Sequence, residues 1–262
     1  MLYFPQLASG TVGQYPVSKN LIQRTITNTV PDGSVVRYAD PGAPFVQWTL
    51  QFQGLADSEI ATLQQFFATC EGQLNAFTFT DPLGNLLLWS EDFTQPAWEK
   101  STLLQLTTGL SDPNGGTSAT HVTNPTGADL TLQQSVSAPG WYCYALSVYI
   151  QSQIPVNVSL ASQTGGVTNT SQYTASAAWQ RASLSGQANT TADAVTVGVT
   201  IPAGQSVTVF GFQLEAQPAV SPYKPSYEVS GIYTNAHFSG DALTVTTTAP
   251  NRNQCTLAIT AH

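Results

Sequence analysis

The densest group of side chains that could do chemistry in this chain is a set of three carboxylates, Glu91, Asp92 and Glu99. A glycosidase needs two carboxylates fixed across a cleft, one of them with a raised pKa. A calcium ion would instead be held by carboxylates together with backbone carbonyls. These three residues do not have the spacing of a metal-ligand motif, and they lie near Lys100. This pattern favours a solvated loop. We therefore predict neither an enzyme nor a metal site.

The sequence lacks the other common catalytic and metal-binding patterns. The histidines are far apart and show no zinc-ligand spacing, and the serines include no Gly-x-Ser-x-Gly elbow. The cysteines are odd in number and are interpreted as buried thiols, with no disulfide framework. A Gly-x-x-x-x-Gly-Lys phosphate loop is also absent, so no cofactor is expected. The residues concerned are His121, His237, His262, Cys70, Cys143 and Cys255.

Aromatic side chains offer a different kind of chemistry, which is stacking against the face of a sugar ring. Trp98 follows a turn, whereas Trp141 and Tyr149 fall opposite the presumed core face of their strand. These three residues are therefore the candidate carbohydrate-binding residues. The alternative for each of them is a place in the core or over its ends, because aromatic residues dominate the energetics of protein cores.

Composition narrows the set of partners. Charged residues make up 8% of the 262 residues and the net charge is −8, so the surface must consist largely of neutral polar groups. Such a surface is typical of extracellular β-proteins and virion components. The seven Lys and Arg residues are scattered, which argues against nucleic-acid binding. No signal peptide and no apolar run of about 20 residues is found, so we expect neither conventional secretion nor membrane insertion.

The clearest secondary-structure pattern in the N-terminal part is a strand–helix–strand stretch. Apolar and polar residues alternate from Trp48 to Gln53, as in a strand with one buried face. Apolar residues then recur every three to four positions and predict a helix over about 57–71, with Asp57 as N-cap and Gly72 just beyond its end. A second strand is expected around Phe77–Phe79.

The segments before this stretch predict an arm and a hairpin. Residues 3–20 contain several prolines and glycines, and their apolar side chains need a partner surface in this chain or in a neighbouring subunit. Leu21–Val30 and Val35–Tyr38 flank the turn signal Pro31–Ser34 and predict a β-hairpin. A loop is expected at Asp40–Pro44.

These features together resemble the N-terminal part of phage tail-tip proteins of the distal tail type, including the related family in prophages and gene transfer agents. The resemblance rests on the aromatic strand, the Leu55–Glu59 helix start, Phe66-Phe67, Gly72 and the Phe77–Pro82 exit. It implies a ring, usually a hexamer, that joins the tail tube to the hub.

The middle of the chain has a different pattern. Short alternating strands are expected at Trp141–Ile150, Val156–Leu160, Trp179–Leu184 and Ala194–Ile201, each bounded by Gly, Pro, Asn or Asp. Many short strands without helices are typical of a sandwich or jelly roll.

This region resembles the carbohydrate-binding-module-type jelly rolls that are appended to many phage tail proteins. The resemblance rests on the opening 85–100, the loop 111–119, the strand 145–150, the strand start 179–181 and the closing segment 212–215. It concerns the fold, and ligand binding is a separate question.

The last stretch, 226–262, is too short to bury a core of its own and is expected to pair with strands of 1–84. The predicted fold is thus mainly β: a discontinuous β-sandwich or barrel with one α-helix, formed by 1–84 and 226–262, and an inserted jelly roll over 85–225. Insertion is tolerated where the host offers a surface loop with adjacent ends.

Our leading functional hypothesis is a structural virion protein of a phage or prophage-derived tail tip, assembled in the bacterial cytoplasm. Its expected partners are further copies of itself in a ring, the tail tube and hub proteins, and a host-surface glycan as a secondary ligand. One alternative is a host-surface carbohydrate-binding module with no ring-forming role. Another is an enzyme that acts on polysaccharide.

Overall fold

The computed structural model describes residues 1–40, 42 and 45–261, so most of the loop expected at Asp40–Pro44 lies outside the described residues. Eighteen strands and one helix are found in the described part, which confirms the mainly β class. The chain divides into two compact units. The discontinuous unit comprises Met1–Ala8, Gly13–Phe79 and Tyr233–His262, and the jelly-roll unit comprises Ser9–Val12 and Thr80–Ile232.

A six-stranded sheet forms the frame of the discontinuous unit. Its order is β1-β4-β18-β16-β5, and β17 pairs with β18. Leu50 of β4 lies opposite Leu257 of β18, so the C-terminal strand lies beside a strand from the first quarter of the chain. The strands are β1 (Val17–Ile22), β4 (Phe45–Leu55), β5 (Phe77–Thr80), β16 (Ile232–Phe238), β17 (Val245–Ala249) and β18 (Arg252–Ala261).

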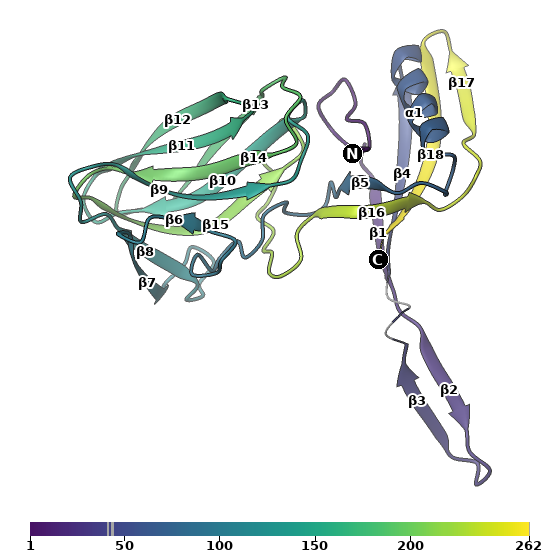
Figure 1. The fold of residues 1–262 in the computed structure, drawn as a ribbon, viewed down its shortest axis with the longest axis horizontal. Coiled ribbons are helices and arrows are strands. Elements are labelled where there is room, and N and C mark those ends of the chain that lie inside the picture. The colour runs from purple at the N-terminus through teal and green to yellow at the C-terminus, as the bar shows by residue number, and fades with distance from the viewer. Residues whose placement is uncertain (41, 43–44, 262) are drawn as a thin grey trace. The chain divides into compact units, whose positions relative to one another are not determined.

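The helix α1 (Asp57–Thr69) runs alongside β4 and β18 in Figure 1. Its N-cap is Ala56, one residue before the predicted Asp57. The Glu59 carboxylate accepts a hydrogen bond from the Ala56 N–H at 2.9 Å, while Asp57 accepts one from the Asn253 side chain at 2.7 Å. No helix in the described residues has the length and apolar character needed to cross a membrane.

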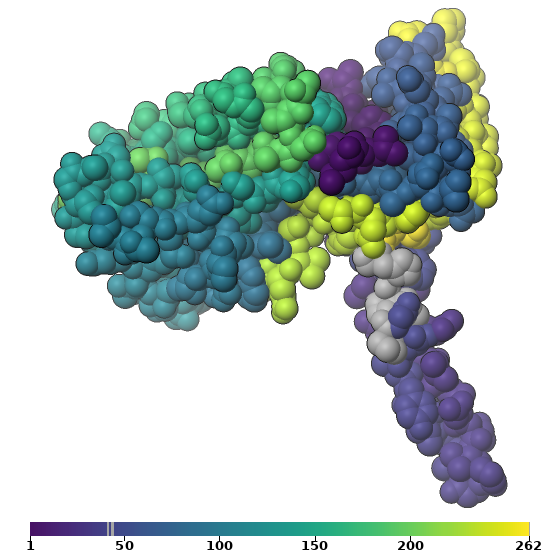
Figure 2. Space-filling view, in the orientation of Figure 1, coloured from purple at the N-terminus to yellow at the C-terminus, as the bar shows by residue number. Residues whose placement is uncertain are grey.

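Aromatic rings fill the core between this sheet and α1. The Phe4 ring lies 5.7 Å from that of Phe66 and 5.6 Å from that of Phe79, which in turn lies 5.0 Å from the Trp48 ring. The first residues of the chain lie on the surface beside the helical segment in Figure 2. Phe4 and Leu7 are buried. This part of the N-terminal arm therefore uses the core of its own chain as partner.

The strands β2 (Thr25–Thr29) and β3 (Val35–Ala39) form the predicted hairpin, with Ile26 opposite Tyr38. Within the described residues they pair only with each other. Every residue of β2 is exposed, and the side chains of Ile26 and Tyr38 are 43% and 54% exposed. An isolated two-stranded hairpin is at best marginally stable in water, so this one lacks the packing that usually stabilises a hairpin.

The jelly-roll unit consists of two five-stranded antiparallel sheets, of order β13-β10-β15-β8-β7 and β12-β11-β14-β9-β6 (Figure 1). Alternate apolar residues of both sheets, such as Leu146 and Val197, form the core between them. The strands are β6 (Glu99–Lys100), β7 (Gln105–Leu110), β8 (Ala119–Thr123), β9 (Leu130–Val136), β10 (Cys143–Gln151), β11 (Val156–Thr164), β12 (Val167–Ala175), β13 (Gln180–Gln187), β14 (Val195–Ile201) and β15 (Ser206–Glu215).

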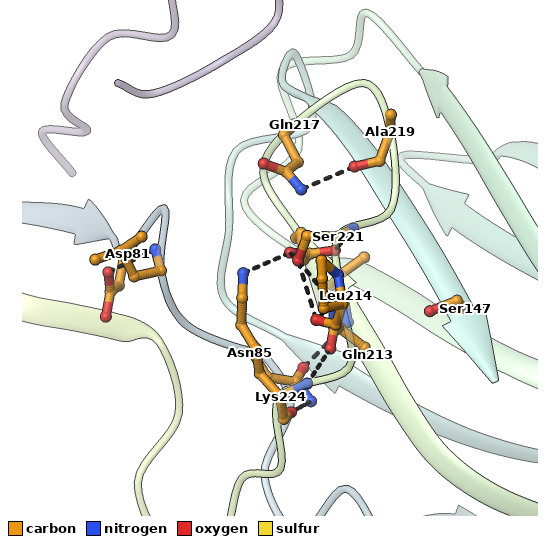
Figure 3. Close-up of polar contacts among 12 residues, drawn as sticks. Asp81, Asn85, Ser147, Gln213, Leu214, Gln217, Ala219, Ser221 and Lys224 are labelled. Atoms are coloured by element: carbon orange, nitrogen blue, oxygen red, sulfur yellow. Dashed lines mark hydrogen bonds and ion pairs between the residues drawn. The ribbon is translucent and has the colours of Figure 1, made fainter. Parts of the chain in front are cut away.

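Asn85 ties the start of this unit to its end (Figure 3). Its side-chain NH2 donates to the carbonyls of Phe212 at 2.8 Å and Lys224 at 3.2 Å, and its side-chain oxygen accepts from the N–H groups of Leu87 and Leu214, both at 3.1 Å. Asn85 is buried, so no water competes for these bonds.

The partly exposed Lys224, which lies near Asn85 in Figure 3, forms an ion pair with the buried Glu215. Lys224 Nζ donates to Glu215 Oε1 at 2.8 Å, and the Ser221 N–H donates to Glu215 Oε2 at 2.9 Å. Arg181 in turn donates to the Ser221 carbonyl at 2.7 Å. Burial alone would raise the pKa of Glu215, but the bonds from Lys224 and Ser221 outweigh it and hold the pKa below its ordinary value.

Replacing Asn85 by Ala should lower the free energy of unfolding of the jelly-roll unit by roughly 2–4 kcal/mol, because buried backbone groups lose their partners. Urea unfolding can be followed by tryptophan fluorescence, since Trp89, Trp98, Trp141 and Trp179 all lie in this unit. The control is Asn114→Ala at an exposed loop position. Equal stability of both variants would contradict the structural role of Asn85.

Glu215→Gln should destabilise the jelly-roll unit by roughly 2 kcal/mol at pH 7. Since the folded-state pKa of Glu215 is depressed, its contribution is present at neutral pH and is lost as the pH falls below the ordinary glutamate pKa and through the depressed one. Wild type and variant should therefore converge in stability on acidification, as measured by urea unfolding from about pH 7 to pH 3. The exposed Glu228→Gln is the matched control. A pH-independent difference would contradict this account.

Candidate functional site

An open cleft of about 450 Å³ lies within the jelly-roll unit. Three segments line it: Trp89 to Thr94 after the entry of the unit, the facing parts of β7 and β8 with the loop between them, and the exit residues Ser226 and Tyr227. Two aromatic rings, two carboxylates and several hydroxyls thus surround one space.

Backbone pairing positions the two aromatic residues of the cleft. The Trp89 N–H donates to the Tyr227 carbonyl at 2.9 Å, and the Ser90 N–H donates to the Ser226 carbonyl at 3.1 Å. The Ser226 N–H donates to Ser90 Oγ at 2.8 Å. The Tyr227 side chain is 58% exposed, so it is free to contact a ligand while its backbone is fixed.

Trp89 has a left-handed backbone, with φ of +50°. This conformation is costly for a bulky residue and persists where the surroundings fix it. Its carbonyl accepts hydrogen bonds from Trp98 Nε1 at 2.9 Å and from the Asp92 N–H at 3.1 Å. Buried Trp98 therefore holds the turn that presents Trp89 and Asp92 to the cleft.

The two carboxylates of the cleft differ in their bonding. Asp92 accepts hydrogen bonds from the Thr94 N–H at 3.0 Å and from Gln95 Nε2 at 2.8 Å. Burial opposes its ionisation, but these bonds, with the charge of Lys100, hold the pKa of Asp92 below its ordinary value. Glu91 Oε1 accepts one bond, at 3.1 Å, from the hydroxyl of Tyr223. Burial raises the pKa of Tyr223, so it stays a neutral donor.

Asp112 organises the loop that supplies hydroxyls to the cleft. Its carboxylate accepts from the N–H groups of Asn114 at 2.8 Å, Gly116 at 3.0 Å and Ser118 at 3.0 Å. Burial works against ionisation, yet the backbone donors outweigh it and lower the pKa of Asp112. A Cβ at Gly116 would lie 2.6 Å from the carboxylate, which explains the glycine. Ser118 and the adjacent Thr117 line the cleft as a result.

Ser226 contributes an unsatisfied polar group. The residue belongs to the cleft lining and is only 6% exposed, and its Oγ is buried without a hydrogen-bond partner among the described residues. A buried polar group without a partner costs free energy, and this oxygen is not exposed to a ligand in the cleft.

Trp98, a predicted carbohydrate-binding residue, is 2% exposed. Its ring packs 5.0 Å from that of Phe93 and 4.8 Å from that of Phe212. It therefore presents no ring face to a sugar, and its contribution is to hold the backbone of Trp89. This is the core placement that was the alternative for Trp98.

Trp141 and Tyr149 lie apart from the cleft lining. Trp141 precedes β10, is 41% exposed and packs edge-on against Tyr142 with 6.2 Å between ring centroids. Tyr149 is half-buried on β10, and the guanidinium of Arg181 lies 5.5 Å from its ring centroid. The structure therefore places the three predicted residues in three separate environments.

Of the three carboxylates noted in the sequence, Glu91 and Asp92 line the cleft and Glu99 does not. The described residues contain no group of three side chains suited to hold a metal ion. His121 contacts Thr208 and His237 contacts the Gln73 carbonyl, whereas His262 lies outside the described residues.

Sequence reasoning missed Trp89 and Tyr227 as surface aromatics. The signal for Trp89 is its place immediately before two carboxylates. The signal for Tyr227 is its place at the exit of an inserted unit, because the ends of such a unit lie close together.

No protein-family model and no curated protein matches this chain. Among solved structures, it is similar to a family 61 carbohydrate-binding module in complex with β-1,4-galactotriose, at 17% identity and a TM-score of 0.41 over 50% of this chain and 97% of that chain. It is similar to the C-terminal family 22 carbohydrate-binding module of Clostridium thermocellum Xyn10B, at 14% identity and a TM-score of 0.43 over 54% of this chain and 99% of that chain.

A further similar structure is the enzymatically active domain of tailspike protein 4 of bacteriophage CBA120. Its identity is 14% and its TM-score 0.38, over 52% of this chain and 21% of that chain. At these identities the likeness concerns the fold of about half the chain and says nothing about a ligand.

Proposed function

We propose that the jelly-roll unit binds a saccharide in the cleft between Trp89, Glu91 and Tyr227. The observation that carries the proposal is the exposed Tyr227 ring beside a half-buried tryptophan, in an open cleft otherwise lined by hydroxyls and carboxylates. A sugar ring has an apolar face that stacks on an aromatic ring and hydroxyls that need hydrogen-bond partners. The cleft supplies both kinds of contact.

The proposed activity is binding without catalysis. Glu91 and Asp92 are consecutive residues of the same wall of the cleft. Glycosidases use two carboxylates that flank the bond to be cleaved. Adjacent carboxylates on one wall are better suited to accept hydrogen bonds from sugar hydroxyls.

Tyr227→Ala should weaken saccharide binding by about tenfold, through loss of roughly 1–2 kcal/mol of ring stacking. The measurement is isothermal titration of the full chain with a panel of neutral and amine-bearing oligosaccharides. Trp141→Ala is the matched control, because it removes an exposed aromatic ring outside the cleft. A loss of binding in Trp141→Ala with Tyr227→Ala unaffected would move the site to Trp141.

The second candidate function is assembly into a ring with further copies of this chain, as part of a phage or prophage-derived tail tip that contacts tube and hub proteins. The specific observation in its favour is the β2–β3 hairpin, with Ile26 and Tyr38 paired on one exposed face. Its marginal stability is relieved if a second copy covers this face. An arm that contacts the next subunit gives a heterologous interface, and repeated heterologous contacts form a ring when the rotation between subunits closes.

The hairpin can be removed without separating its ends, because the Asp40 N–H donates to the Arg24 carbonyl at 3.0 Å. We expect that replacing residues 25–39 by a two-residue Asn-Gly turn converts a ring into monomers while the fold is kept. Native mass spectrometry and circular dichroism of both proteins test this. A monomeric wild-type chain at micromolar concentration, or a ring that survives the deletion, would contradict the assembly proposal.

A further inference from the structure

The chemistry of the cleft lining restricts the kind of saccharide it takes. We propose that the cleft prefers a saccharide with a protonated amine over its uncharged or acidic counterparts. This inference rests on the proposed saccharide-binding function and adds the ligand class.

The lining carries negative charge and contains no cation of its own. Glu91 and Asp92 are its only ionisable side chains besides Tyr227, and it includes no Lys, Arg or His. The Asp92 carboxylate is occupied by Thr94 and Gln95. Glu91 is different, because its Oε1 accepts from Tyr223 and its Oε2 accepts no hydrogen bond from the described residues. An ammonium group pairs with this oxygen, whereas a carboxylate or sulfate on the ligand is repelled.

Lys100 is the cation whose charge acts on Asp92. Its Nζ donates to the Trp98 carbonyl at 3.4 Å, and it lines a different opening together with Glu99. Lys100 thus moderates the charge of Asp92 and leaves that of Glu91 available to a ligand.

The aromatic residues of the cleft add to this preference. A cation over the face of a Trp or Tyr ring is attracted to the ring electrons, and a carboxylate nearby increases the attraction. Tyr227 is exposed and Trp89 is half-buried, and Glu91 follows Trp89 by two residues on the same wall.

The hydroxyl-bearing side chains of the lining add a second kind of contact. They belong to Thr94, Thr108, Thr117, Ser118 and Thr120. An amine alone cannot meet the whole lining, whereas a sugar brings hydroxyls for these side chains together with its amine. This combination favours an amino sugar over a simple organic cation.

The test compares the β-1,4-linked tetramer of glucosamine with the tetramer of N-acetylglucosamine, which has the same backbone without the charge. Titration of the full chain at about pH 5.5, where amines are protonated, and about 20 mM NaCl should show the glucosamine tetramer binding at least about fivefold more tightly. The difference should shrink at about 500 mM NaCl, because salt screens the attraction. A tetramer of galacturonate should bind more weakly than either.

Glu91→Gln keeps an acceptor for Tyr223 and removes the charge, so it should reduce the preference for glucosamine to about twofold or less. Asp193→Asn removes one negative charge at an exposed residue outside the lining and should leave the preference unchanged. Equal binding of the two tetramers, tighter binding of the acetylated or acidic one, or an unchanged preference in Glu91→Gln would overturn the inference. If no saccharide of the panel binds, both this inference and the proposed saccharide-binding function are contradicted.

Discussion

Hydrogen bonding between the segment that opens the jelly-roll unit and the segment that closes it is the constraint on which the rest of this unit depends. Asn85 alone satisfies two buried N–H groups and two carbonyls, and the Ser90–Ser226 pairing extends the contact toward the surface. Buried backbone groups left unpaired would each cost free energy comparable to a lost hydrogen bond. The entry and exit segments are therefore held against β15 by bonds that are lost if these distant parts of the chain separate.

The cleft is a direct product of the same pairing. Trp89 and Tyr227 come from segments 138 positions apart, and one backbone hydrogen bond places them beside each other. The buried Trp98 fixes the turn on one side, and Asp112 fixes the hydroxyl-bearing loop on the other. Side chains that are themselves buried thus position the exposed ones, which is how a site can be rigid on a surface built of loops.

The sequence predicted the elements better than the site. Periodicity identified the strand at Trp48, the single described helix and the strand at Trp141–Ile150, because buried faces require regular spacing. It located the helix N-cap one residue late, since Glu59 caps the backbone of an alanine that carries no capping side chain. It did not identify β12 (Val167–Ala175), whose polar residues show little hydrophobic alternation. The sequence could not show which of Trp98 and Trp89 is buried in the core, because burial depends on which distant segment covers each ring.

The closeness of the first and last segments of the jelly-roll unit has a consequence for how such a chain evolves. The Asp81 N–H donates to the Gly231 carbonyl and the Gly231 N–H to the Asn85 carbonyl, each at 2.7 Å. The first and last residues of this module are joined by hydrogen bonds. Recombination can therefore insert, remove or exchange the module as one piece, provided that the receiving domain has two neighbouring strand ends. The surface of the module can then change while the carrier keeps its own core.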